Sequence, residues 1–68
     1  MKKRYLVVFS DRKGTPLYYS SSRAYGVHWS ANLDYAVKQS YENAMLTLNL
    51  MEQFCGDVEK GTGRLELA

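Results

Sequence analysis

The sequence predicts an α+β fold: a small, mainly antiparallel sheet of three strands, with one main helix packed on one of its faces. Three observations lead to this prediction. A β-branched and aromatic run covers 4–10, helical apolar spacing covers 40–55, and period-two alternation returns at 64–67. A chain of 68 residues forms a single domain, 1–68, and so short a domain buries only about 60% of its extended-chain surface.

The first strand is expected at 4–10, RYLVVFS. Alternation directs Tyr5, Val7 and Phe9 to one face of the sheet and Leu6 and Val8 to the other. Both sets are apolar, which is typical of a central strand. Since a single helix covers only one face, we expect the other apolar face to stay open for a partner.

A turn at 11–16, DRKGTP, should lead into a second strand at 17–21. Gly14 supplies the permissive backbone of this turn, and Pro16 suits the edge of the next strand because it lacks an N–H.

Residues 22–39 are less regular. Gly26 indicates a turn or bulge, 27–29 can form a short strand, and 34–38 can form one helical turn or an irregular connection.

The main helix is expected over 40–55, SYENAMLTLNLMEQFC, with Ser40 as N-cap, Glu42 in the first turn and Gly56 as the stop signal. Its core face comprises Tyr41, Ala44, Met45, Leu48, Met51 and Cys55. A second apolar stripe, Leu46, Leu50 and Phe54, repeats every four residues on the other side. Nothing else in the chain is left to cover this stripe, so it predicts a self-association or partner surface.

The last strand is expected within 57–67, as one strand with a bulge or a small hairpin at Gly61–Gly63. A right-handed crossover would make this strand parallel to the second strand. If it lies beside the first strand instead, the order is second–first–third and the sheet is antiparallel.

Charge is distributed unevenly along the chain. Residues 1–23 contain six basic residues and one acidic residue, for a net +5, whereas 24–68 contain three basic and six acidic residues, for a net −3. This asymmetry can steer an acidic partner or be ordinary solvated charge. The basic residues that could contact nucleic acid are Lys2, Lys3, Arg4, Arg12, Lys13 and Arg23.

Aromatic residues gather near some of these charges. Tyr18, Tyr19 and Trp29, with Arg23 between them, are second candidates for a contact surface. Aromatic and basic residues together suit single-strand stacking, a protein-binding hot spot or simple half-buried packing, and the K/R-G-F/Y-G/A-F-V-x-F/Y RNA motif is absent.

No catalytic set is recognisable, so we expect a protein that is not an enzyme and that uses no metal or cofactor. His28 and Cys55 occur once each; Cys55 falls on the core face near the helix C-terminus, where a thiolate is disfavoured. Gly61–Gly63 lacks the Gly-Lys-Ser/Thr ending of a phosphate loop. One cysteine and the lack of a signal-like or membrane-spanning run favour a cytoplasmic protein with no membrane contact.

Trp29, the Asp-x-Ala step of Asp34 and Ala36, the Ser40 cap and Ala44 in an Ala/Leu-rich helix form a pattern that extends to the final strand. It resembles small β-β-α-β accessory proteins encoded by bacteriophages and prophages. This resemblance implies a protein in the cytoplasm of a bacterial host. It also implies that the target is a host protein, such as a component of a defence system that an anti-CRISPR-like inhibitor would block.

The sequence therefore predicts a non-enzymatic homodimer or higher oligomer that acts by binding a protein. Two alternatives stay open: a basic nucleic-acid-binding oligomer, whose affinity would fall steeply with salt, and an oligomer that sequesters a nucleotide at a tyrosine-lined interface.

Overall fold

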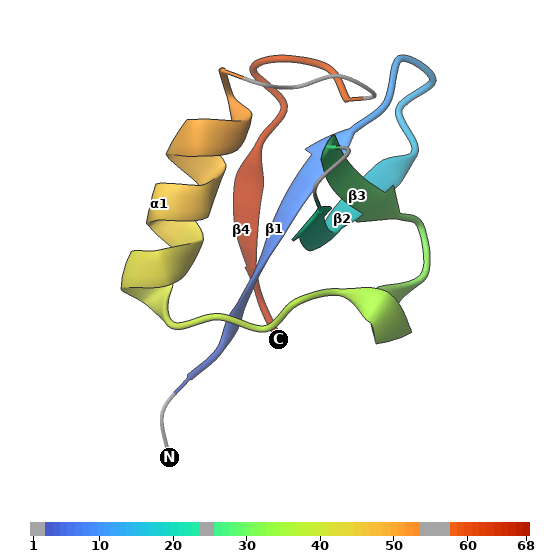
Figure 1. The fold of residues 1–68 in the computed structure, drawn as a ribbon. Coiled ribbons are helices and arrows are strands. Elements are labelled where there is room, and N and C mark those ends of the chain that lie inside the picture. Colours follow the sequence, from blue (N-terminus) through green and yellow to red (C-terminus); the bar gives the residue numbers. More distant parts are fainter. Residues whose placement is uncertain (1–2, 24–25, 54–57) are drawn as a thin grey trace.

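The computed structural model describes residues 3–23, 26–53 and 58–68. The described elements follow the order β1 (Tyr5–Ser10), β2 (Pro16–Arg23), β3 (Gly26–Ser30), the 3-10 turn η1 (Leu33–Tyr35), α1 (Tyr41–Met51) and β4 (Arg64–Leu67). In this part of the chain the strands form one antiparallel sheet of order β3-β2-β1-β4. Figure 1 shows α1 beside β4 and β1, with β2 and β3 beyond β1.

The α+β class is confirmed, and the last strand does lie beside the first. The expected number of strands is wrong, because residues around 27–29 form a full strand, β3, that pairs with β2 from Tyr18↔Ser30 to Arg23↔Gly26. The register shifts between Tyr19 and Ser21, where one extra residue enters β2. Polar serines and a glycine lower the strand propensity of this part of the sequence. Hydrogen bonding between β2 and β3 nevertheless holds both segments as strands.

The β1–β2 turn forms as its residues predict. The Oδ1 atom of Asp11 accepts from the backbone N–H of Lys13 and of Thr15, both at 2.8 Å. Gly14 has φ +86°, which a side-chain-bearing residue adopts only with strain. Pro16 opens β2 opposite Ser10, as expected for a residue without an N–H.

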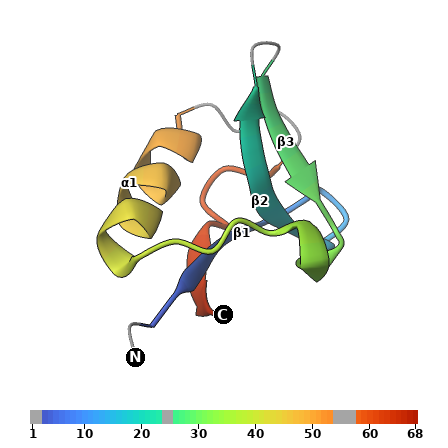
Figure 2. The same ribbon diagram turned by 60° about the horizontal axis from the view of Figure 1, so that its bottom comes forward.

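β1 and β2 pair only at one end. The β1–β2 pairs run from Val8↔Tyr18 to Ser10↔Pro16. Toward the start of β1, a separate segment that contains Gln39 takes the place of β2. Tyr5 and Gln39 exchange backbone hydrogen bonds of 2.7 and 2.9 Å, and the Val37 N–H donates to the Tyr19 carbonyl at 3.0 Å. Figure 2 shows β2 and β3 continuing together away from β1 as a hairpin.

Helix α1 begins where the cap predicts. The Ser40 hydroxyl oxygen accepts from the Asn43 N–H at 3.3 Å, and Glu42 lies in the first turn. The helix ends at Met51, with Glu52 as its C-cap. The expected helix over 40–55 is therefore wrong at 52–53, where the Gln53 N–H donates to the Leu50 carbonyl at 3.1 Å and closes a turn. The expected extension through Phe54 and Cys55 to Gly56 lies outside the described residues.

The core lies between α1 and one face of the sheet, which we call the helix face. Val7 and Phe9 of β1 meet Ala44 and Met51 of α1 and Val58 of the following segment, all buried. Partly buried side chains surround this cluster: Tyr5, Leu17, Tyr19, Val27, Trp29, Leu48 and Leu65. The expected core stripe of the helix is thus largely confirmed, although Tyr41 is exposed and only its ring edge meets Tyr5, 5.4 Å between centroids.

The opposite side of the sheet, which we call the second face, is not the open apolar face that the sequence predicts. Leu6 and Val8 are buried, with 4% and 0% exposure. Cross-strand pairing sets Val8 between Tyr18 and Arg64, and Leu6 beside Glu66. These long side chains flank a narrow apolar row and shield it, which alternation within β1 alone could not reveal.

The segment before β4 is a turn and not part of a long strand. Gly61 has φ +89°, and the Thr62 Oγ1 atom lies 2.6 Å from the Glu59 carbonyl and accepts from the Ser10 N–H at 3.0 Å. The expected strand over 57–67 is therefore wrong before Arg64, because residues 59–62 close the end of β1 with turn and side-chain hydrogen bonds.

Gly63→Ala should be strongly destabilising. A Cβ at this position would lie 2.6 Å from Leu48 Cδ1 and from Phe9 Cζ. Phe9 is fully buried, so it has no space to move aside. We expect a loss of about 2–3 kcal/mol in the free energy of unfolding, measured by urea denaturation.

Gly61→Ala is the matched control. It imposes backbone strain at positive φ but meets nothing within 4 Å, so its cost should be about 1 kcal/mol. If Gly63→Ala cost no more than Gly61→Ala, the close packing over Gly63 would be wrong.

Candidate interaction surfaces

The outer side of α1 carries the clearest exposed apolar residues among the predicted sites. Leu46 is 68% exposed and Leu50 is 51% exposed. They lie four residues apart, on the side of α1 opposite the buried Ala44 and Met51. Phe54, the third predicted member of this stripe, lies outside the described residues. We call Leu46 and Leu50 the outer leucine pair.

The surroundings of the outer leucine pair are polar but almost uncharged. Asn43 and Asn49 are exposed on the same helix, and Glu42 is the only charged residue within Tyr41–Met51. Helix side chains of this kind donate and accept hydrogen bonds without imposing a charge on a partner. This helix side therefore combines two apolar contacts with a neutral border.

The second set of predicted contact residues is divided between the two faces of the sheet. Tyr19 and Trp29 pair across β2 and β3 on the helix face, and Trp29 meets the edge of Phe9 at 5.2 Å and of Tyr19 at 6.0 Å between ring centroids. Tyr18 lies on the second face, in register with Val8. Arg23 pairs with Gly26 at the end of β2, and its side chain is outside the description. The structure therefore does not bring the three aromatic rings into one stack.

Four of the predicted basic contact residues lie at opposite ends of β1, away from Arg23 at the end of β2. Lys3 and Arg4 are exposed before the strand, and Arg12 and Lys13 are exposed in the turn after it. Six residues at about 3.3 Å each separate these pairs by roughly 20 Å, and Figure 1 shows the two ends apart. Lys2 lies outside the described residues.

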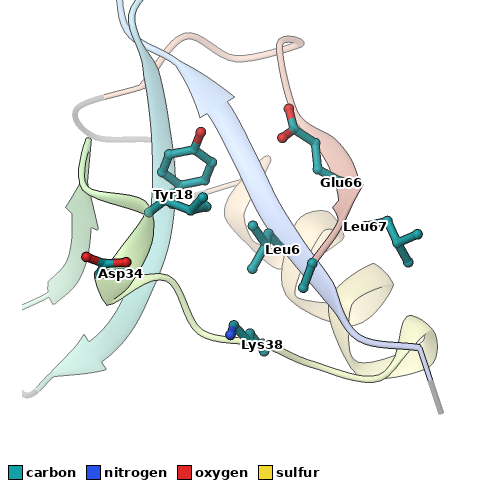
Figure 3. A pocket seen from close by; sticks show the side chains of 8 residues that line it. Leu6, Tyr18, Asp34, Lys38, Glu66 and Leu67 are labelled. Carbon is teal, nitrogen blue, oxygen red and sulfur yellow. The ribbon is translucent and has the colours of Figure 1, made fainter. Parts of the chain in front are cut away.

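A shallow hollow on the second face was not anticipated from the sequence. It has a volume of about 300 Å³, and Figure 3 shows Leu6 at its centre, with Tyr18, Glu66 and Lys38 around it and Asp34 on the adjoining η1 turn. Its lining residues are Leu6, Tyr18, Leu33, Asp34, Lys38, Glu66, Leu67 and Ala68. Leu33 and Leu67 are more than half exposed.

This hollow depends on pairing that no short sequence pattern contains. Leu6 and Glu66 are 60 residues apart and become neighbours only through the β1–β4 register. The one local signal is Asn32, whose side-chain oxygen accepts from the Asp34 N–H at 3.0 Å and caps η1. That cap fixes the turn but does not indicate which side of the sheet it approaches.

The potential metal ligands are scattered over the described part of the chain. His28 is exposed on β3, beside a second small hollow that Ser20, Ser21 and Tyr35 also line. Residues 3–23, 26–53 and 58–68 contain no group of three or more His, Cys, Asp or Glu side chains placed to hold a metal ion. None of the helices in these ranges has the length and hydropathy to span a membrane.

Comparisons with known proteins find no matching family model, no similar curated protein and no similar solved structure. The resemblance to phage accessory proteins therefore stays a prediction.

Trp29→Ala should act mainly on stability. Its ring packs on Phe9 and Tyr19 and is partly buried, so removing it should lower the free energy of unfolding by about 2 kcal/mol, less than a fully buried Trp would cost. His28→Ala, next to it but exposed on the second face, should change stability by less than about 0.5 kcal/mol. Equal effects of the two substitutions in chemical denaturation would contradict the packing role of Trp29.

Proposed function

We propose that the protein is a non-enzymatic binding module that presents the outer leucine pair of α1 to another protein. The observation that carries this proposal is the exposure of Leu46 and Leu50 on a helix whose opposite side is buried in the core. Full burial of a leucine is worth about 1.5–3 kcal/mol relative to exposure, so two adjacent leucines offer a substantial part of a binding free energy.

The form of this surface favours an apolar groove or helix as the partner. An amphipathic helix is recognised through apolar residues at i and i+4, which is the spacing of Leu46 and Leu50. Asn43 and Asn49 border the leucines, so a matching partner would place hydrogen-bonding groups at the rim of the interface. The proposal does not depend on the electrostatic attraction that a nucleic acid would require.

The phage resemblance extends this proposal to a host protein, with inhibition of a defence system as the consequence of binding. In that case inhibition would follow from occupying a surface of the target, since the proposal assigns no catalytic residue. The nucleic-acid and nucleotide-sequestering alternatives remain predictions, and no arrangement of the described residues favours either of them over protein binding.

Substitution of Leu50 tests the proposal. Leu50→Asp and Leu50→Lys should both reduce partner binding at least about tenfold, because each places a charge in an apolar contact. If both variants lose binding although their new charges have opposite sign, the cause is the lost apolar contact and not repulsion by one kind of charge. The measurement is a quantitative pull-down from nuclease-treated bacterial lysate, with captured proteins compared between wild type and variants by mass spectrometry.

Leu33 provides the matched control. Its exposed fraction, 54%, is similar to the 51% of Leu50, but it lies on η1 and not on α1. Leu33→Asp and Leu33→Lys should leave capture unchanged. All four variants should keep stability within about 1 kcal/mol, because the replaced leucines are exposed. A discrete protein retained by the Leu50 variants, or lost only from the Leu33 variants, would contradict the proposal.

A further inference from the structure

Among the described residues, β4 is the last strand of the sheet, and the hydrogen-bonding groups of its outer edge can be assigned. The Ala68 N–H donates to the Arg4 carbonyl at 2.8 Å, which identifies Arg4 and Ala68 as a hydrogen-bonded pair of the β1–β4 ladder. Such pairs alternate along an antiparallel ladder, so Glu66 and Arg64 also direct their backbone groups toward β1. The N–H and C=O groups of Leu65 and Leu67 therefore point away from the sheet.

This edge is short, at four residues, but it lacks two of the features that commonly prevent pairing. β4 contains no proline and no lysine, and its end residue Leu67 is 59% exposed. Arg64 and Glu66 lie on the second face, where their side chains are exposed and form an ion pair of 2.9 Å within the strand. Charges of opposite sign on a short edge disfavour non-specific pairing and favour a strand whose charges are complementary.

We propose that β4 is a self-association edge, where a second copy adds its own β4 antiparallel with Leu65 on the two-fold axis. In this register, the outward groups of Leu65 pair with those of Leu65 in the second copy. Arg64 of each copy then lies directly opposite Glu66 of the other. Two oppositely charged cross-strand pairs form, and no like charges oppose one another.

The same register also accommodates the exposed leucine. Alternation along β4 places Leu67, which also borders the hollow at the end of the strand, on the same side as Leu65. In this register Leu67 of one copy falls opposite Gly63 of the other, which has no side chain to obstruct it. Leu48 and Phe9 already fill the space over Gly63, as the 2.6 Å approach to a Cβ there shows. Leu67 of the second copy would therefore rest beside an apolar surface and lose its exposure to water.

Self-complementarity favours a second copy over a foreign strand. A two-fold axis requires each half of the contact to match the other half, and the R-x-E spacing of Arg64 and Glu66 meets this requirement within one strand. The edge is separate from the outer leucine pair, because Leu46 and Leu50 face away from the sheet. The dimer proposal can therefore fail or succeed independently of the proposed function.

Single charge reversals provide the test. Arg64→Glu places acidic residues opposite one another at both sites, and Glu66→Arg does the same with basic residues. Each variant alone should dimerise about tenfold or more weakly than wild type in sedimentation equilibrium, since both cross-strand pairs change from attractive to repulsive. An equimolar mixture should restore dimers as heterodimers.

The mixture is decisive because the ion pair within the strand is lost in both variants. Restoration can only come from pairing between chains. Leu50→Lys should leave the dimer unchanged, which separates this test from that of the proposed function. A wild-type protein that stays monomeric up to millimolar concentration, or charge variants that dimerise as well as wild type, would overturn the proposal.

Cysteine pairs then fix the register and exclude general charge attraction. Residues 64 and 66 would form a non-hydrogen-bonded pair with a Cα separation of about 4.5 Å, within the range of a disulfide. In a Cys55→Ser background, a mixture of Arg64→Cys and Glu66→Cys should yield a disulfide-linked heterodimer on mild oxidation. Either variant alone should link far more slowly, and preferential linkage of one variant to itself would overturn this register.

Discussion

The packing around Phe9 is the interaction on which the rest of the structure depends. This fully buried ring meets Trp29 of β3 edge to face, and the approach to Gly63 brings the segment before β4 against it. Leu48 of α1 closes the same space. Elements from four parts of the chain thus share one side chain, which is how so small a domain joins a helix, a hairpin and a returning strand into one core.

Local chemistry explains the parts of the fold that the sequence predicts well. Asp11 and Gly14 specify the first turn, and Ser40 specifies the start of α1, because each acts on backbone groups within four residues. The helical spacing of Ala44 and Met51 likewise predicts the buried side of α1. A sequence pattern is sufficient to predict a structural element when the contacts that stabilise that element are close in sequence.

Long-range pairing explains the parts that could not be predicted. β3 gains its order from β2, and Leu6 and Val8 are shielded by residues of β2 and β4 that only register places beside them. Alternation within β2 already places Tyr18 and Tyr19 on opposite faces, whereas only the β2–β3 register places Trp29 beside Tyr19. Helix geometry alone predicts the outer leucine pair, whereas the position of β4 at the edge of the sheet follows only from the strand order.

The exchange of hydrogen bonds between Tyr5 and Gln39 has a mechanical consequence. Ser40, the cap of α1, follows Gln39 directly, so the start of the helix is clamped to the start of β1. The Gln39 side chain adds a bond from its Nε2 to the Thr47 hydroxyl oxygen at 3.0 Å, two turns into the helix. A force applied to α1 by a bound protein would therefore reach the central strand through these hydrogen bonds at the start of the helix.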